Sequence, residues 1–182
     1  MELATERRRV DEWFEGDRRT PLVLERRPER DVCSVLFPTR WSDLKFYLRC
    51  TVASIATNIP SSTLKIFLYR LLGAKIGRNV SLMPGVLLDP FYPWLIEIED
   101  DAFLGVYCRV LTHEYTARNF RAGRVHIGRG AVIGAWATVR SGVAIGAEAT
   151  VGFNSLVTRD VPDGETVLGV PARPVRSSAG NA

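Results

Sequence analysis

The sequence is poor in the residues that build metal sites and disulfide frameworks. Its 182 residues contain two histidines and three cysteines, Cys33, Cys50 and Cys108. An odd number of cysteines without metal-ligand spacing predicts neither a disulfide scaffold nor a metal site, and it favours a reducing, cytoplasmic compartment. The amino terminus, MELATERRRVDEWFEGD, carries charges where a secretory signal needs an apolar stretch.

Long hydrophobic runs and a strong net charge are missing too. The longest uncharged stretch, residues 50–64, contains Asn58 and Pro60 and is too short to cross a bilayer. The net charge is +4. Within residues 1–31 the charges nearly cancel, because eight arginines stand against nine acidic residues. The excess lies in later arginines, which fit a polyanionic ligand or ordinary solvated surface: Arg118, Arg121, Arg124, Arg129, Arg159, Arg173 and Arg176. We expect no nucleic-acid partner.

What the sequence does contain is a six-residue period. Aliphatic residues recur at Ile127, Ile133, Val139, Ile145, Val151 and Val157, with glycine directly after four of them. The fifth position of each unit is small: Ala131, Ala137, Val143, Ala149, Ser155 and Val161. Six residues are too few for a helical repeat. The period predicts a short strand and a corner in each unit, wound into triangular coils stacked about 4.8 Å apart so that backbone groups pair between coils.

The period also appears upstream, from Ile76, with two interruptions. Ten residues separate Leu88 from Ile98, and seventeen separate Val110 from Ile127. The first interruption predicts a bulge containing FYPW, and the second predicts a protruding polar loop. We therefore divide the chain into a charged arm (1–40), a helical segment (41–73) and a repeat domain with a tail (74–182). The arm is expected to be ordered only if it docks, with a short helix around VDEWFE.

Two helices are predicted in residues 41–73. The first begins near Ser42 and stops at Pro60, and the second begins at Ser61 or Ser62 and ends at Gly73. Their apolar positions fall on one face each: Leu44, Tyr47, Leu48, Val52, Ile55 and Ile59, then Leu64, Phe67, Leu68, Leu71 and Leu72. The helices are interpreted as a cap on one end of the stack. Basic residues beside these faces leave peripheral membrane association open: Lys45, Arg49, Lys65 and Arg70.

The repeated [LIV]-G-x-x-[small]-x unit, LYRLLGAKIGRNV, THEY and LVTRDVPDGETVLGVPARPV together closely resemble the hexapeptide-repeat acyltransferases. The nearest group is the maltose, galactoside and exopolysaccharide O-acetyltransferases, and the resemblance runs from Leu68 to Val175. It implies a mainly β fold, a left-handed parallel β-helix with an N-terminal helical cap. It also implies a homotrimer with active sites between subunits. The implied reaction is direct transfer from acetyl-coenzyme A, or another acyl-coenzyme A, to a hydroxyl of a sugar-like acceptor, without a metal.

His113, in LTHEYTARNF, is the candidate catalytic residue. An imidazole near its unperturbed pKa can take a hydroxyl proton and return it to a thiolate, and the resemblance implies a general base at this place. His126 is expected to point outward, and Cys108 to lie in the core rather than act as a nucleophile. The candidate acceptor residues are Asp89, which matches an acidic pocket residue of the family, Glu114, and three possible sugar-stacking aromatics, Tyr92, Trp94 and Tyr115. Strand alternation is expected to turn Glu114 away from His113.

The resemblance also implies a groove for coenzyme A. Gly134 and Ala135, and one coil later Gly152 and Phe153, are expected at stacked corners that hold the pantetheine arm. Trp136 is expected near the acyl group, because this chain has Val132 where relatives often carry an aromatic residue. Near the phosphates the implied residues are Thr158, Arg159, Arg173 and Arg176.

Four alternatives remain from the sequence. An amino-sugar acceptor would make the enzyme an N-acyltransferase, and an acyl-carrier protein could replace coenzyme A as donor. A zinc carbonic anhydrase of the β-helical γ class needs three imidazoles, whereas this chain has only His113 and His126. A non-catalytic β-helix scaffold is the fourth.

Overall fold

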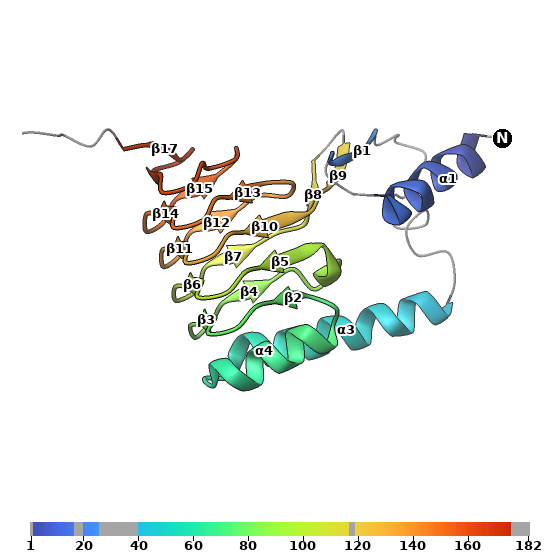
Figure 1. Ribbon diagram of the computed structural model, residues 1–182. Coiled ribbons are helices and arrows are strands. Elements are labelled where there is room, and N and C mark those ends of the chain that lie inside the picture. Colours follow the sequence, from blue (N-terminus) through green and yellow to red (C-terminus); the bar gives the residue numbers. More distant parts are fainter. Residues whose placement is uncertain (1, 17–19, 26–39, 117–118, 176–182) are drawn as a thin grey trace, which may run out of the picture.

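The repeats form a triangular prism with three parallel sheets as its walls (Figure 1). The structure is a computed structural model that describes residues 2–16, 20–25, 40–116 and 119–175. The first wall contains β2 (Lys75–Ile76), β5 (Ile96–Ile98), β10 (Val125–Ile127) and β13 (Ala144–Ile145). The second contains β3 (Ser81–Leu82), β6 (Phe103–Leu104), β11 (Val132–Ile133), β14 (Thr150–Val151) and β16 (Thr166–Leu168). The third contains β4 (Leu87–Leu88), β7 (Arg109–Val110), β12 (Thr138–Val139) and β15 (Leu156–Val157).

Each coil takes one strand from each wall, which confirms the left-handed parallel β-helix. Val132, for example, lies opposite Phe103 in the coil before and Thr150 in the coil after. The predicted inward residues stack in the core, where Ile127, Ile133 and Val139 are completely buried. The small fifth positions are buried with them, and so is Cys108. A short strand β17 (Arg173–Pro174) pairs antiparallel with β16 and ends the described prism.

The recurring glycine is needed for close approach between coils. A Cβ on Gly134 would lie 2.7 Å from the backbone nitrogen of Phe153 in the next coil. The left-handed turn falls two residues later, at residues that are often not glycine, such as Trp136 (φ 62°) and Asn154 (φ 54°). The period therefore reflects a backbone contact at its second position and a tight turn at its fourth.

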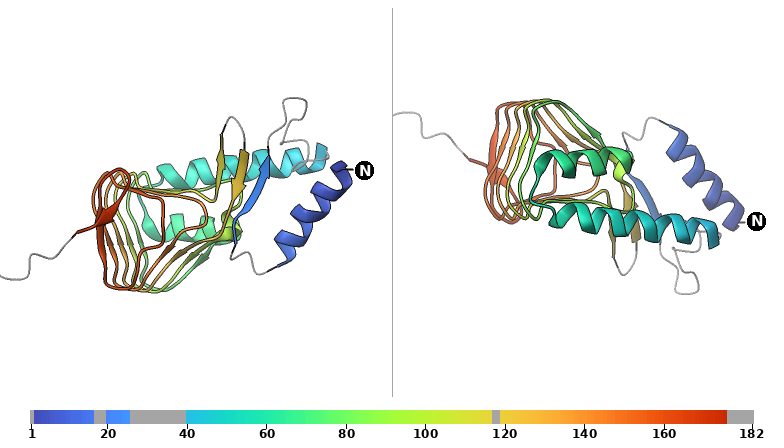
Figure 2. Two further views of the ribbon diagram at one scale, coloured as in Figure 1. Left: turned by 90° about the horizontal axis from the view of Figure 1, so that it is seen from above. Right: turned by 90° about the horizontal axis from the view of Figure 1, so that it is seen from below.

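Two helices close the end of the prism at β2, β3 and β4 (Figures 1 and 2). They are α3 (Arg40–Asn58) and α4 (Ser62–Leu71), whose N-cap is Ser61. The first coil has no preceding coil to pair with, and helix side chains bind its open backbone groups. Ser62 accepts from the Leu82 N–H (3.0 Å), and the Lys65 ammonium donates to the Met83 carbonyl.

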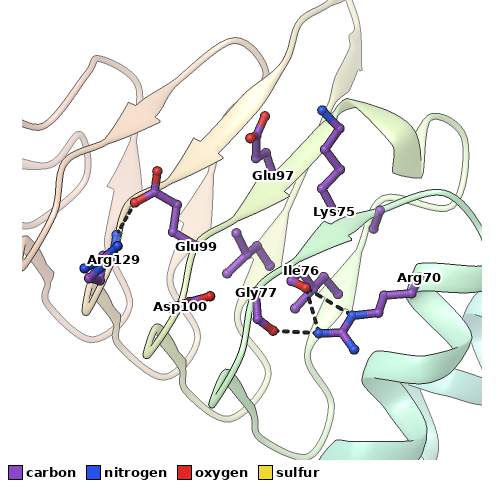
Figure 3. Close-up of a pocket in the computed structure, with 10 residues that line it drawn as sticks. Arg70, Lys75, Ile76, Gly77, Glu97, Glu99, Asp100 and Arg129 are labelled. Carbon is purple, nitrogen blue, oxygen red and sulfur yellow. Dashed lines mark hydrogen bonds between the residues drawn. The ribbon is translucent and has the colours of Figure 1, made fainter.

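Two more side chains complete this cap. The Tyr69 hydroxyl accepts from the Leu88 N–H at 3.3 Å. Arg70 donates to the Ile76 carbonyl at 2.7 Å and to the Gly77 carbonyl (Figure 3). All three walls thus end on a side chain of α4, which satisfies polar groups that would otherwise be orphaned.

The inner face of the cap is more polar than expected. Its buried side chains are small or polar, namely Ala53 and Ala56 on α3 and Lys65 and Tyr69 on α4. Of the predicted apolar stripes, Leu68 and Leu72 pack against the core, but most of the large members are exposed on the outer side: Leu44, Tyr47, Leu48, Ile55, Leu64, Phe67 and Leu71. Within the described residues, no helix is both long and apolar enough to span a bilayer.

The cap hydrogen bonds are expected to contribute measurably to stability. Replacing Lys65 with Met keeps the length of the buried side chain but removes its hydrogen bond to the Met83 carbonyl, which then keeps only the longer bond from the Val86 N–H at 3.3 Å. We expect a loss of about 1–3 kcal/mol in the free energy of unfolding, measured with urea. Lys45→Met, an exposed control on α3, is expected to change it by no more than about 0.5 kcal/mol. Equal stability of the two variants would refute this role for Lys65.

Candidate active site

Both insertions leave the prism at the corner between the third and first walls. Residues 89–95 join β4 to β5 and contain a 3-10 turn, η1 (Pro93–Leu95). Residues 111–124 join β7 to β10 and contain a hairpin of β8 (His113–Tyr115) and β9 (Asn119–Ala122). The two insertions belong to consecutive coils, since the Asp89 N–H donates to the Val110 carbonyl. Side chains from both therefore meet at one corner.

The closest contact between these insertions joins Asp89 and His113. The Asp89 carboxylate lies 2.6 Å from His113 Nδ1 and also accepts from the backbone N–H groups of Thr112, His113 and Phe91. Its side chain is 0% exposed. Burial disfavours its charge, but the hydrogen bonds from His113 and the backbone outweigh burial and hold the pKa of Asp89 below its ordinary value.

An ionised Asp89 fixes the state of the imidazole. It can only accept, so Nδ1 of His113 carries a proton, and in the neutral ring Nε2 is the nitrogen with the free lone pair. Asp89 was expected to line an acceptor pocket. It lies instead beneath the histidine, with both oxygens occupied. Sequence spacing gave no sign of this pair, because the two residues are 24 positions apart in separate insertions.

Aromatic rings surround His113 and leave part of it open. The ring of Phe91 is centred 4.2 Å away, and those of Tyr92 and Tyr115 are 5.8 and 5.7 Å away. The His113 side chain is 15% exposed. Tyr115 is exposed, whereas Tyr92 is only 3% exposed and offers no open face for a sugar. Trp94 contacts Tyr92 edge-on and lies under the Arg49 guanidinium. The expected stacking role is thus geometrically open for Tyr115 and not for Tyr92.

Glu114 points away from His113, as strand alternation predicts. Its carboxylate accepts from Arg140 Nε at 2.7 Å and from Ser141 Oγ at 2.6 Å. These bonds tie the hairpin to the next coil. Glu114 therefore anchors the loop rather than joining the histidine. His126 is on the outer side of the first wall, where its ring lies 3.5 Å from Glu99.

The arm docks on the histidine loop. Helix α1 (Glu2–Glu15) is longer than predicted, and β1 (Leu22–Glu25), which was not predicted, pairs antiparallel with β9. Pro21 packs against Gly142 so closely that a Cβ on that glycine would lie 2.6 Å from the proline ring. A second apolar cluster joins arm and loops: Val10, Leu22, Leu24, Tyr92, Leu95, Phe120 and Ala122. Figure 2 shows α1 and β1 beside the hairpin.

The residues expected to bind coenzyme A fall at two different corners. Gly134 and Ala135 stack under Gly152 and Phe153 at the corner between the second and third walls. Trp136 lies at this corner too, stacked on Tyr107 with ring centres 4.5 Å apart. Tyr107 holds the same left-handed position one coil earlier. It was not singled out from the sequence, because it is a fourth-position residue of an ordinary repeat unit, residues 104–109.

The basic candidates lie elsewhere. Thr158 and Arg159 follow β15 at the corner between the third and first walls, the same corner as His113 but two coils further on. Arg159 and Arg173 line one pocket together with Asp160 and Glu165. Arg176 is outside the described residues. Within one chain the third wall separates His113 from the Gly134–Trp136 corner, so the predicted donor groove and base do not meet in a single subunit.

Comparison with known proteins identifies the family. The family described as "Bacterial transferase hexapeptide (six repeats)" matches residues 124–159. The protein named "Putative acetyltransferase YvoF" of Bacillus subtilis is 37% identical over 131 residues, which cover 71% of this chain and 76% of that protein. A Staphylococcus aureus protein with the name "Putative acetyltransferase SAS0727" is also 37% identical, over 70% of this chain and 80% of its own.

Solved structures share the fold. An acetyltransferase of Vibrio cholerae O1 biovar eltor, complexed with acetyl-coenzyme A, has a TM-score of 0.61 at 21% identity, covering 76% of this chain and 90% of its own. A maltose O-acetyltransferase of Clostridium difficile has a TM-score of 0.60 at 16% identity, and the match covers 76% of this chain and 88% of that one. The chain belongs to the bacterial hexapeptide-repeat transferases. It is an acetyltransferase of that family.

Docking of the arm is expected to hold the hairpin in place. Leu24→Asp puts a charge into the apolar cluster, so we expect amide hydrogen exchange of residues 119–122 to speed up about tenfold or more. Val23→Asp is the matched control, because Val23 is on the same strand with its side chain exposed. Equal exchange in both variants would mean that the arm does not stabilise the loop.

Proposed function

We propose that this protein transfers an acetyl group from acetyl-coenzyme A to a hydroxyl of a saccharide-like acceptor, with His113 as general base. The observation that carries the proposal is the buried, ionised Asp89 bound to Nδ1 of a partly exposed histidine. The pair leaves Nε2 as the proton acceptor, and Asp89 stabilises the imidazolium that forms. Asp89 is a positioning residue in this scheme.

The proton balance needs only one residue. His113 Nε2 takes the hydroxyl proton while the oxygen attacks the thioester carbonyl. The tetrahedral intermediate then collapses, the carbon–sulfur bond breaks, and the imidazolium returns the proton to the leaving thiolate. No acyl-enzyme is formed. Cys108 supports this reading, because burial raises the pKa of its thiol to about 12 and keeps it from acting as a nucleophile.

We favour a hydroxyl acceptor over an amine because the corner presents a candidate general base. A neutral amine attacks a thioester with its own lone pair, whereas a hydroxyl needs its proton removed as it attacks. A histidine backed by a buried carboxylate meets that need. The solved maltose O-acetyltransferase with the same fold is consistent with a saccharide acceptor. An amino sugar, or a carrier protein as donor, is the alternative.

The donor groove and the trimer are proposed together. Gly134, Ala135 and Gly152 carry little side-chain bulk and lie at one corner with the exposed rings of Trp136 and Phe153, and the Vibrio cholerae acetyltransferase with this fold was solved with acetyl-coenzyme A. Thr158, Arg159 and Arg173 are proposed to meet the phosphates. Because the third wall separates this corner from His113, the thioester is proposed to come from the groove of a neighbouring subunit. A cyclic homotrimer supplies such an interface at each active site.

Substitutions in the dyad are expected to affect turnover rather than donor binding. His113→Ala removes the base, and we expect kcat to fall roughly 10²-fold or more. Asp89→Asn keeps the shape but not the charge, so we expect a smaller loss of about tenfold or more. The Kd for coenzyme A, measured by calorimetry, is expected to stay nearly constant in both. A fully active His113→Ala variant would rule out the assignment.

The proposed donor groove is best tested by substituting Ala135, which is next to Gly134, rather than a glycine itself. Substituting Gly134 or Gly152 would push atoms of the next turn of chain apart, so it would report on folding as well as on binding. Ala135→Leu fills the groove instead, and we expect the KM for acetyl-coenzyme A to rise about tenfold. Ala147→Leu makes the same change at the corner between the first and second walls and should leave KM unaltered. Similar KM values in the two variants would place the donor elsewhere.

A further inference from the structure

The outer face of the helical cap is apolar and uncovered in this chain. Four large side chains of α3 and three of α4 are exposed there: Leu44, Tyr47, Leu48 and Ile55, with Leu64, Phe67 and Leu71. Phe67 is 61% exposed. On each helix these positions lie opposite the residues that contact the first coil, Ala53 and Ala56 on α3 and Lys65 and Tyr69 on α4. The seven side chains are called the cap face below.

Rotation of the helices cannot bury the cap face. The inner side of α4 is committed to the open backbone groups of the first coil through Ser62, Lys65, Tyr69 and Arg70. Turning apolar residues inward would leave those groups without partners in the interior, which costs about 1–3 kcal/mol for each. The exposed cap face is therefore built into the fold, and an exposed apolar patch of this kind marks an interaction surface.

Charge indicates what covers this surface. Residues 44–75 contain five basic residues, Lys45, Arg49, Lys65, Arg70 and Lys75, and no aspartate or glutamate. Of these, Lys45, Arg70 and Lys75 are exposed. Arg70 and Lys75 border acidic residues of the first wall, and the Arg70 guanidinium already binds two carbonyls, so Lys45 is the exposed basic residue at the rim of the cap face. Two caps placed face to face would bring like charges together, which opposes self-association. Helices with an apolar face and a basic rim lie in the interface of bilayers that contain anionic lipids.

We propose that the cap face docks on an anionic phospholipid surface, with α3 and α4 lying in the plane of the membrane. Leu48, Phe67 and their neighbours enter the acyl boundary, and Lys45 at the rim meets lipid phosphates. Both helices lie across one end of the prism (Figure 2), so the prism axis points away from the membrane. At Tyr47 the cap face borders the Asp89–His113 corner, because Phe46 of α3 contacts both Tyr47 and Phe91. Its occupation by lipid does not depend on the reaction.

Flotation of the full chain with vesicles tests the proposal. We expect binding to vesicles of phosphatidylglycerol and phosphatidylcholine, weaker binding to phosphatidylcholine alone, and release by added salt. Leu48→Gln and Phe67→Gln each remove one large apolar contact, so we expect partitioning to weaken about tenfold for each. Val23→Gln, an exposed apolar residue on β1 away from the cap, is the matched control and should bind like the unaltered chain.

Charge variants give an independent readout. Lys45→Glu is expected to weaken binding to the anionic vesicles, whereas Arg129→Glu, on the exposed side of the third coil, should not. Acetyl transfer to a soluble acceptor should be unchanged in the cap variants, which separates this proposal from the catalytic one. Two results would overturn it: absence of flotation with anionic vesicles, or a larger assembly in sedimentation that Leu48→Gln and Phe67→Gln dissociate, which would assign the cap face to a second copy.

Discussion

Hydrogen bonding between stacked coils is the constraint on which this structure depends. Each strand satisfies its backbone groups with the coil above and the coil below, so the end of the stack needs substitutes. Here Ser62, Lys65, Tyr69 and Arg70 supply them. Because these polar side chains face the first coil, Leu64, Phe67 and Leu71 on the opposite side of α4 face outward, while Leu68 and Leu72 still pack against the core. One backbone requirement thus explains both the cap and the apolar surface of α4.

The same constraint decides where a site can form. A strand inside a wall cannot be lengthened without disturbing its neighbours, but a corner tolerates extra chain. Both insertions use the corner between the third and first walls in consecutive coils, and this stacking brings Asp89 to His113 across 24 positions. The carboxylate is held by three backbone N–H groups, so the regular stack below also orients the imidazole. The geometry of the proposed site is inherited from the register of the coils.

Period and composition predicted the prism, because a residue such as Ile133 or Ala137 is buried by the winding of its own coil. His113 was singled out from its loop and from the resemblance of the sequence to the family, and its role stays a prediction. The contact between Asp89 and His113 was not predicted, since the length of an insertion does not say where its side chains point. Strand β1 escaped prediction because four residues paired with a distant hairpin leave almost no local pattern. The helices showed that apolar periodicity fixes a stripe but not the direction in which it points.

The central functional claim is that base and thioester come from different subunits. Mixing His113→Ala chains with Ala135→Leu chains, after dissociation and reassembly, tests it directly at low acetyl-coenzyme A, where the second variant is also nearly inactive. An interface that joins an intact histidine to an intact groove then reappears, and we predict activity of about a quarter of the unaltered enzyme from random assortment in a ring. Activity no higher than the average of the two separate variants would contradict the account, because each chain would then carry a complete site of its own.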